Sequence, residues 1–442
     1  MDEEIKEFTR IFLEKIDNEK IHLISHFDTD GITSAAIMSK TLEKLNKQFS
    51  LKILKQLDEK EIHLFPKDKV IILLDLGSSS LEELSKLSNQ IIIIDHHEIT
   101  LNSEIPNIHI FNPHLSENYE DLCSAELTYL ISKKISEENK DLAHLSILGM
   151  IGDTMEKNIT KTRNQIINNA NVTIKRGLLL YPSTRPLDKT LEYCSRPFIP
   201  GITGNPPETY KLLNEAGIKK IGKKFKALID LNEQEMKNLV TCIMLRLSSK
   251  ETEEYLGNLY LLKFFNKVED ARELSAIINA CSRMDKPEIA LLMCLGNLDA
   301  RKKAERIYVK YRQHIISGLK HVDSIKKIQG KEYIIINAQE KIKDTIIGTI
   351  TSIISFSKIY TEGTIIIGMA HNDERIKISA RIVGRSNTSR NLKKLLDSVI
   401  YTLGSGIVGG HKMAAGGMIN KKDETKFIEI LQKKLEIEMI KI

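Results

Sequence analysis

The sequence IHLISHFDTDGI, residues 21–32, decides the fold class of this chain. Its first part, Ile21–Ser25, is a continuous apolar run of the kind that forms a buried strand. A polar turn, HFDTDG, follows at residues 26–31, and a helical pattern then runs from about Ile32 to Leu45. A buried strand that enters a helix through a short polar turn is typical of a βαβ unit.

Two further apolar runs follow the first helical pattern, at Val70–Leu76 and Gln90–Ile94. They are continuous rather than alternating, which is typical of parallel strands that helices cover on both faces. Helical patterns come next, at Ser124–Glu137 and Asp141–Ile151. We therefore predict an N-terminal α/β domain on a largely parallel, doubly wound sheet.

The rest of the chain predicts a second, smaller α/β domain. The sequence is rich in Pro and Gly from Tyr181 to Pro207, mostly helical in pattern over 208–300, and charged along a spacer helix from Asp299 to about Ile328. Strands and a final amphipathic helix are expected at Tyr333–Asn337, Thr364–Met369, Ile376–Ile382 and Asp423–Glu438. The predicted fold class is two α/β domains, residues 1–205 and 331–442, joined by a helical insert and spacer helix at 206–330.

Composition excludes several classes of protein. With 41% hydrophobic and 28% charged residues the chain is globular, and a net charge of +6 permits a polyanionic partner without demanding one. Aromatic residues make up only 5%, which argues against a surface built on many stacking rings. The apolar runs are far shorter than a bilayer-spanning segment and the N-terminus is acidic, so we expect a soluble cytoplasmic protein with no membrane partner. The five cysteines form no CxxC pair, which predicts reduced thiols.

Acidic residues and histidines stand at the ends of four predicted elements. A lone Asp after a strand is usually a turn or capping residue, and a lone His pair is usually surface or core. Here the signals coincide within one domain, and the carboxyl ends of parallel strands share the edge where ligands bind. The signals are Asp28 and Asp30 after the first strand, Asp75 after the second, Asp95-His96-His97 after the third, and Asp153 after a helix. If the three strands are neighbours, we expect one crevice to contain Asp28, Asp30, Asp75, His96 and His97.

Such a cluster suits metal-assisted phosphoryl transfer. Mixed carboxylate and imidazole ligands suit Mn²⁺ and also admit Mg²⁺, Zn²⁺ or Co²⁺. Carboxylates packed together repel one another unless cations neutralise them. Two ions about 3.5–4 Å apart, bridged by one carboxylate, would share a hydroxide nucleophile and clamp the phosphate oxygens.

The motifs HFDTDG, LLDLG, DHH and GMIGD resemble motifs I to IV of the DHH phosphoesterase superfamily, in order and in spacing. The late stretch GGHKMAAGG resembles the hallmark of the DHH-associated domain that follows in this superfamily. Within it, the stretches LLYPSTRP, PFIPGITGN and ARELSAIINACSRM are similar to the archaeal RecJ-like branch of single-strand exonucleases. The resemblance covers essentially the whole chain.

Carried over residue by residue, the resemblance implies that Asp75 bridges two metal ions. Asp28 and Asp30 would each hold one ion, and His96 and Asp153 would complete the ligand set. The remaining motif residues would serve the substrate and the ligands: Asp95 would orient a ligand and His97 would face the scissile phosphate.

His26 departs from the family pattern. Some members carry a metal-binding His four residues before the first Asp of motif I, a position that Ile24 occupies here. His26 lies only two residues before Asp28, so it would either bind a metal from this shifted position or support the ligands.

The C-terminal domain is expected to grip the substrate. Glycines at 406, 409, 410, 416 and 417 let backbone N–H groups approach an anion closely, although a plain turn with a structural His would look the same. A phosphate-binding groove would explain sequence-independent binding. The substrate-binding residues we expect are His97, Ser379, Arg381, Gly409, Gly410, His411 and Lys412, with Asn279 and Arg283 as weaker candidates on a helix.

Other polar residues carry weaker signals. Arg185 and Arg196 are read as parts of a solvated loop, and the basic run Lys219–Lys226 as a solvated helix face. Four further histidines belong to no constellation and are read as surface or core: His109, His114, His144 and His314.

These observations predict a metal-dependent, RecJ-like exonuclease that hydrolyses single-stranded DNA, and possibly RNA, to nucleoside monophosphates in DNA replication or repair. The resemblance implies two Mn²⁺ ions, with Mg²⁺ or Co²⁺ as substitutes, and the GINS complex or a repair helicase as a partner. Two alternatives stay open. The substrate would instead be short oligoribonucleotides or cyclic dinucleotides, or the chain would be a largely non-catalytic scaffold of a replication helicase.

Overall fold

A computed structural model describes residues 2–440 except 100–104, 117–118, 195–198, 248–254, 358 and 385–389. It divides the chain into two compact units. The first comprises Met1–Tyr193 and Ile199–Tyr308, and the second comprises Cys194–Phe198 and Val309–Ile442. None of the helices in the described ranges is long and apolar enough to cross a membrane. The two units are described separately.

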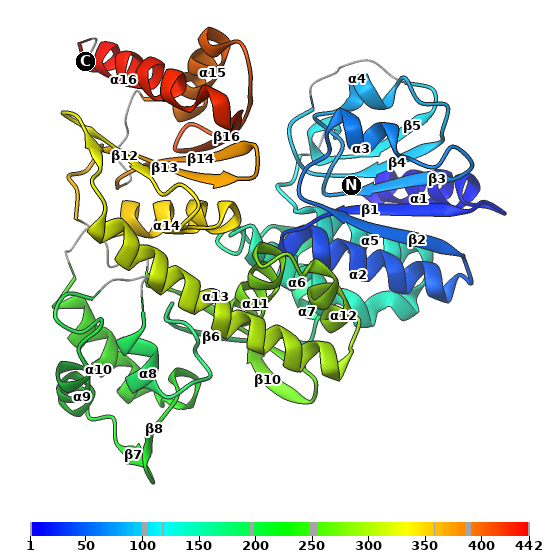
Figure 1. The fold of residues 1–442 in the computed structure, drawn as a ribbon. Helices are drawn as coiled ribbons and strands as arrows, with labels where there is room; N and C mark the ends of the chain where they lie inside the picture. The colour runs from blue at the N-terminus through cyan, green and yellow to red at the C-terminus, as the bar shows by residue number, and fades with distance from the viewer. Residues whose placement is uncertain are drawn as a thin grey trace. The chain divides into compact units, whose positions relative to one another are not determined.

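The first unit is built on a five-stranded parallel sheet with the strand order β2-β1-β3-β4-β5 (Figure 1). This confirms the predicted parallel sheet, and the predicted strands are its three central ones. The two edge strands were not predicted, because polar residues interrupt their apolar runs, which read FSLKIL and IHIF. The strands are β1 (Ile21–His26), β2 (Phe49–Leu54), β3 (Val70–Leu74), β4 (Ile91–Ile94) and β5 (Ile108–Phe111).

Helices cover both faces of this sheet, as a doubly wound fold requires. Successive strand residues point to opposite faces, so Ile72 packs in one core cluster with α1 and α5, while Ile71 and Leu73 pack in another with α3 and α4. Helices α2, α5 and α6 pack closely on one another. The helices are α1 (Asp2–Lys15), α2 (Thr29–Lys44), α3 (Glu59–His63), α4 (Leu81–Leu84), α5 (Ser124–Ile135) and α6 (Ala143–Gly152).

The remainder of the first unit is helical as expected, with a small sheet in addition. Strand β9 (Leu256–Phe264) pairs with β6 (Thr173–Leu178) and with β10 (Lys267–Asp270), all antiparallel. Phe265 and Asn266, with φ of 48° and 61°, form the turn between β9 and β10, and this turn lacks the usual Asn-Gly or Asp-Gly signal. The helices are α7 (Lys161–Asn169), α8 (Leu187–Glu192), α9 (Pro206–Glu215), α10 (Glu233–Met244), α11 (Ala271–Arg283) and α12 (Pro287–Cys294).

The basic run Lys219–Lys226 is not a helix face, so that interpretation is wrong. It forms a hairpin of β7 (Lys220–Ile221) and β8 (Lys224–Phe225). Gly222, at the first position of its two-residue turn, has a φ of 63°, which glycine adopts without strain and which ends any helix here.

The second unit contains a six-stranded sheet with the order β11-β12-β13-β14-β16-β15. Only β12 and β13 are parallel, and the other neighbours are antiparallel. Helices α15 and α16 share a buried core with one face of the sheet, and α14 packs on the other face (Figure 1). The long helix α13 (Leu298–Ser324) leads into this unit. The other elements are β11 (Ile328–Gln329), β12 (Tyr333–Asn337), α14 (Asp344–Phe356), β13 (Ile365–Asn372), β14 (Arg375–Ile382), α15 (Leu392–Leu403), β15 (Ile407–Gly410), β16 (Ala414–Asn420) and α16 (Glu424–Ile440).

A fully buried ion pair ties α7 to the beginning of α5. Arg163 donates from Nε and from one terminal nitrogen to the two carboxylate oxygens of Glu126, both at 2.7 Å, and neither side chain is exposed. The guanidinium also donates to the carbonyls of Asp121 and Met155, at 2.6 and 3.1 Å. The Glu126 carboxylate in turn accepts from Cys123 N at 3.0 Å, which caps α5. Arg163 therefore fixes the N-terminus of α5.

We predict that Arg163→Met lowers the free energy of unfolding of the first unit by about 3–5 kcal/mol, because it leaves the Glu126 charge buried without its partner. Urea denaturation of the full chain measures this loss. The matched control is Arg10→Met, which breaks an exposed pair with Glu7 and should cost less than about 1 kcal/mol. Equal losses in the two variants would contradict the role given to Arg163.

Candidate metal centre

The two carboxylates of the HFDTDG turn are held by helix N-termini. Asp28 caps α2, and its Oδ1 accepts from Gly31 N at 3.0 Å. Asp30 lies in the first turn of α2 and is fully buried. Its two oxygens accept from the first backbone N–H groups of α5, Ser124 N at 2.8 Å and Ala125 N at 2.9 Å. The positive end of the α5 dipole therefore holds the Asp30 carboxylate in place.

Asp75 occupies the centre of the cluster. It follows β3 directly, with a φ of 57°, and is 1% exposed. Its Oδ1 accepts from the Ser124 hydroxyl at 3.0 Å, and its Oδ2 lies 3.2 Å from His26 Nδ1. A non-glycine residue in the left-handed region is costly, and this conformation aims the carboxylate into the cluster.

Asp95 and the two histidines follow β4. The Asp95 Oδ1 accepts from His96 N at 2.8 Å and from His97 Nδ1 at 2.7 Å, while its other oxygen accepts from Ser78 N at 3.0 Å. These bonds fix the DHH turn, with His97 Nδ1 donating its hydrogen bond to the Asp95 carboxylate. The side chain of His97 is about half exposed.

Asp153 joins the cluster from the C-terminal end of α6, where it caps the helix. His96 Nε2 lies 3.2 Å from Asp153 Oδ2, 3.6 Å from Asp75 Oδ1 and 3.9 Å from Asp30 Oδ2. On the other side of Asp75, His26 Nδ1 lies 3.0 Å from Asp28 Oδ2. The structure thus brings together the five residues predicted for the crevice and the three other acidic or histidine residues of the motifs, His26, Asp95 and Asp153.

Three groups of side chains offer ligand atoms that all lie within 4.8 Å of one another. The groups are His26 with Asp28 and Asp75, Asp30 with His96 and Asp153, and Asp75 with His96 and His97. Asp75 belongs to two of them, so one buried carboxylate connects neighbouring groups. Carboxylate oxygens and imidazole nitrogens at this spacing fit divalent cations.

The buried negative charges of the cluster raise the pKa values of three of its side chains. Burial, together with the charge of Asp153, raises the pKa of Asp30 to about 7. Burial and the charges of Asp28 and Asp30 raise the pKa of Asp75 well above its ordinary range. Burial alone would lower the pKa of His96, but its hydrogen bond to Asp153 and the charges of Asp30 and Asp75 raise it to about 10. Protons therefore occupy positions that metal ions would take.

Comparison with known families assigns this arrangement. The model of the DHH family, N-terminal domain, matches residues 20–150, which include every residue of the acidic and histidine cluster except Asp153. The DHH-CID domain matches residues 180–255, and the DHHA1 domain matches residues 322–436. The chain belongs to the DHH superfamily.

Two relatives are similar to this DHH chain in sequence. An uncharacterized protein of Methanocaldococcus jannaschii is 27% identical over 441 residues, covering 96% of each chain. A Bacillus subtilis protein named as a prophage-derived single-strand DNA-specific exonuclease is 34% identical over 167 residues, which is 34% of this chain and 28% of that protein.

Solved structures share the fold. RecJ of Thermus thermophilus in complex with Mn²⁺ superimposes with a TM-score of 0.61 at 16% identity, over 97% of this chain and 54% of the RecJ chain, so this chain spans about half of that protein. CDC45 of Entamoeba histolytica superimposes with a TM-score of 0.67 at 13% identity, over 97% and 99% of the two chains. The fold is therefore RecJ-like, with a separate C-terminal α/β domain.

The residues expected to bind substrate in the DHHA1 domain lie on β14 and the β15–β16 hairpin. Ser379 pairs with Gly416, which pairs with Gly409, so these three residues form a line across the sheet. Added Cβ atoms at Gly409 would meet nothing within 4 Å. Gly409 is followed in the chain by three exposed residues, Gly410, His411 and Lys412.

The side chain of Arg381 forms hydrogen bonds within the C-terminal domain. Its Nε donates to Ser352 Oγ at 2.9 Å, and a terminal nitrogen donates to the carbonyl of Ala380 at 2.8 Å. It therefore braces β14 against α14 beside the glycine line.

The weaker candidates lie on α11, which packs against motif I. Ser275 on this helix contacts the Thr29 hydroxyl through its carbonyl and its own hydroxyl, both at 3.1 Å. Asn279 lies one turn further along α11, and Arg283 one turn beyond that, both half-buried. In the Pro-rich loop, Arg185 is not simply solvated, because it pairs with Glu273, whereas Arg196 lies outside the described residues.

Two residues that support the cluster were not predicted. Ser124 places one hydroxyl and one N–H on two different carboxylates, Asp75 and Asp30. Gly149 on α6 packs against Asp30, because a Cβ there would lie 2.6 Å from its Oδ1 and 2.5 Å from the Cβ of Ala125. The sequence signals are a Ser at a helix N-terminus and the first Gly of GMIGD, and neither is distinctive without the three-dimensional neighbours.

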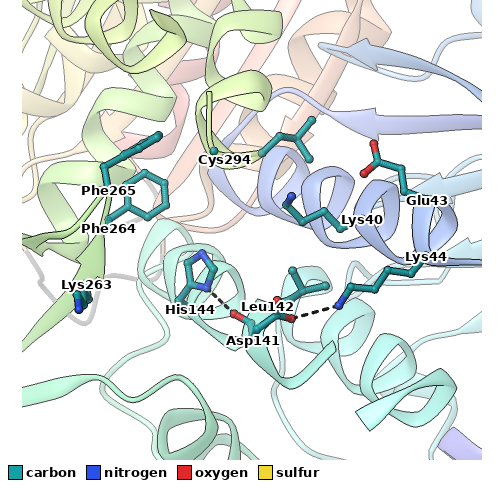
Figure 2. Close-up of a pocket in the computed structure, with 12 residues that line it drawn as sticks. Lys40, Glu43, Lys44, Asp141, Leu142, His144, Lys263, Phe264, Phe265 and Cys294 are labelled. Carbon is teal, nitrogen blue, oxygen red and sulfur yellow. Dashed lines mark hydrogen bonds and ion pairs between the residues drawn. The ribbon is translucent and has the colours of Figure 1, made fainter. Parts of the chain in front are cut away.

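A cavity of about 350 Å³ lies away from the cluster, and no residue of the cluster lines it (Figure 2). Lys40 and Lys44 line it from the C-terminal half of α2, about 17–22 Å along the helix from Thr29. Lys44 Nζ lies 3.5 Å from Asp141, whose carbonyl accepts from His144 Nδ1 at 2.7 Å. His144 therefore lines this cavity and does not belong to the metal cluster.

We predict that divalent-metal binding releases protons and strengthens as pH rises from 6 to 9. The metal-free protein keeps protons on Asp30 and His96 up to a higher pH than the unfolded chain does, so its stability falls as pH rises through the raised pKa values. Metal displaces these protons, so affinity should increase up to about tenfold per pH unit for each proton released.

Isothermal titration calorimetry with Mn²⁺, in buffers of different ionisation enthalpy, counts the released protons. The thermal stabilisation by Mn²⁺ should be larger at pH 9 than at pH 6. Asp68→Asn, at an exposed carboxylate outside the cluster, should behave as the unmodified protein does. Binding without proton release at pH 6–7 would contradict the assignment of these residues as ligands.

Proposed function

We propose that this DHH chain is a metal-dependent phosphodiesterase that degrades single-stranded DNA, and RNA as a second substrate, from an end to nucleoside monophosphates. The observation that carries the proposal is the position of Asp75, a buried carboxylate shared by two groups of candidate ligands. A carboxylate so placed suits a bridge between two divalent cations, for which Mn²⁺ is the proposed ion and Mg²⁺ or Co²⁺ are substitutes. The named exonuclease relative supports the choice of substrate.

The remaining side chains of the cluster are proposed either to bind the metal ions or to contact the phosphate of the substrate. Bound divalent ions would supply Lewis acidity and a nucleophile at neutral pH. His26, Asp28, Asp30, His96 and Asp153 are the proposed ligands beside Asp75. His97 is proposed to face the phosphate with both ring nitrogens protonated, so that Nδ1 donates to Asp95, which fixes the ring, and Nε2 donates to a phosphate oxygen as charge builds there.

The DHHA1 domain is proposed to hold the backbone of the strand. Exposed Gly409 and Gly410, together with exposed His411 and Lys412, offer backbone N–H groups and positive charge to phosphates. Such a surface binds without regard to sequence, which suits an exonuclease that must accept every nucleotide.

We predict that Asp75→Asn reduces Mn²⁺-dependent hydrolysis of a labelled single-stranded oligonucleotide by at least about 10³-fold, because it removes the charge shared by two groups of ligands. The fold should persist, since the variant also removes the repulsion from Asp28 and Asp30. Asp68→Asn serves as the control and should keep full activity. A fully active Asp75→Asn protein would contradict the proposed metal centre.

A second candidate activity is hydrolysis of dinucleotides or cyclic dinucleotides. The two activities separate in a series of 5′- and 3′-labelled DNA and RNA strands of 2 to 40 nucleotides, each with Mn²⁺ and Mg²⁺. We predict that activity persists or rises with length, because the DHHA1 surface adds phosphate contacts. Preference for the dinucleotide would overturn the exonuclease assignment.

A scaffold is the third candidate, favoured by the likeness of the fold to CDC45. The complete set of acidic and histidine side chains argues against a purely structural role, since a cluster of buried carboxylates destabilises a protein that binds no cation. Docking on the GINS complex or a repair helicase remains compatible with a nuclease and is part of the proposal.

A further inference from the structure

The β7–β8 hairpin is the most basic short segment of the chain that the metal centre does not explain. Five of the eight residues in KKIGKKFK, 219–226, are lysines, and none is acidic. The hairpin protrudes beyond helices α8, α9 and α10 (Figure 1). It pairs in the register Lys220↔Phe225 and Ile221↔Lys224, across the turn at Gly222. The two residues of a pair point to the same face, so the hairpin has two chemically different faces.

The inner face anchors the hairpin on α9. Phe225 is 4% exposed, and its ring centroid lies 5.5 Å from that of Tyr210. The Lys220 ammonium lies over both rings, 4.8 Å from the Tyr210 centroid and 5.1 Å from the Phe225 centroid. At the base of the hairpin, Lys226 Nζ contacts both carboxylate oxygens of Glu235, at 2.7 and 2.9 Å. These contacts hold the ribbon in one position.

The outer face has no such partners. Ile221 is 66% exposed, and Lys224 beside it is exposed, as are Lys223 in the turn and Lys219 before the first strand. Within the described part of the chain, no carboxylate forms an ion pair with Lys219, Lys223 or Lys224. Three like charges therefore surround one exposed apolar side chain. Folding gains nothing from this arrangement, because the charges repel and the isoleucine is not packed.

We propose that this outer face binds the backbone phosphates of double-helical DNA, as a second nucleic-acid contact separate from the metal centre. The proposal rests on the proposed nucleic-acid substrate. A two-stranded β-ribbon has the width that the major groove of DNA admits, whereas the major groove of an RNA helix is too narrow. Lys219, Lys223 and Lys224 supply the charge for phosphates on either side of the groove.

The exposed side chain of Ile221 distinguishes this surface from one whose lysines serve only solubility. An apolar side chain at the centre of a basic ribbon contacts base edges or thymine methyl groups once the lysines have seated the ribbon. The rigid inner face matters as well, since an ordered ribbon loses little conformational entropy on binding. A nuclease that digests one strand would use this contact to remain on the duplex beside the strand that it degrades.

The test is the affinity of the full-length protein for a 30-base-pair DNA duplex, measured by fluorescence anisotropy in EDTA at 50–300 mM salt. We expect Lys223→Glu/Lys224→Glu to weaken binding at least about tenfold at 100 mM salt. The negative slope of log K against log[salt] should become less steep by about 2, because two phosphate contacts are lost. Ile221→Ala should weaken binding without changing this slope, because it removes no charge. Both should unfold at the temperature of the unmodified protein.

The control variant is Lys60→Glu/Lys67→Glu, which changes the net charge equally at two exposed lysines of the first unit. The proposal is overturned if the hairpin variant binds duplex as tightly as the unmodified protein, or if the control loses as much affinity. It is also overturned if only binding of polyglutamate falls, since the hairpin would then recognise an acidic polypeptide. The hairpin variant should still hydrolyse a single-stranded hexanucleotide with Mn²⁺ at the unmodified rate. This assay distinguishes failure of the duplex-binding proposal from failure of the proposed nuclease activity.

Discussion

The structure of the first unit depends on how it holds two buried carboxylates side by side. Asp30 and Asp75 are 0% and 1% exposed, and in water-free surroundings their charges would drive the site apart. The beginning of α5 prevents this, because Ser124 donates to both carboxylates and Ala125 adds a second N–H to Asp30. One helix terminus thus donates hydrogen bonds to two acids, one in the first turn of α2 and one directly after β3, and the Arg163–Glu126 pair fixes that terminus.

Strand order then determines which side chains meet. In the order β2-β1-β3-β4-β5, the three strands that carry motifs are direct neighbours, with Asp75 between the turn after β1 and the DHH turn after β4. The parallel register places these turns at one edge, so no long loop is needed to assemble the cluster. Helix α6 completes it by carrying Asp153, and its approach is possible because Gly149 leaves room for Asp30.

The sequence predicted most of the fold and the whole acidic and histidine cluster, for physical reasons that also explain what it missed. Continuous runs such as IIII at β4 are unambiguous, whereas β2 at the sheet edge reads FSLKIL and is only partly buried over most of its length. Ser124 and Gly149 could not be recognised, because their roles depend on neighbours about 90 and 120 positions away in the chain. The run KKIGKKFK was misread as a helix because five lysines have good helix propensity, and a single glycine outweighed them.

The net charge of +6 conceals a separation of charge within the first unit. At the sheet edge, acids outnumber bases so strongly that protons are retained on Asp30 and His96 at pH values where they are normally lost. On the β7–β8 hairpin the balance is reversed, with lysines left unpaired around Ile221. Each excess is unfavourable in the isolated chain, and each would be relieved by a ligand of opposite charge. We propose divalent cations for the sheet edge and nucleic-acid phosphates for the hairpin.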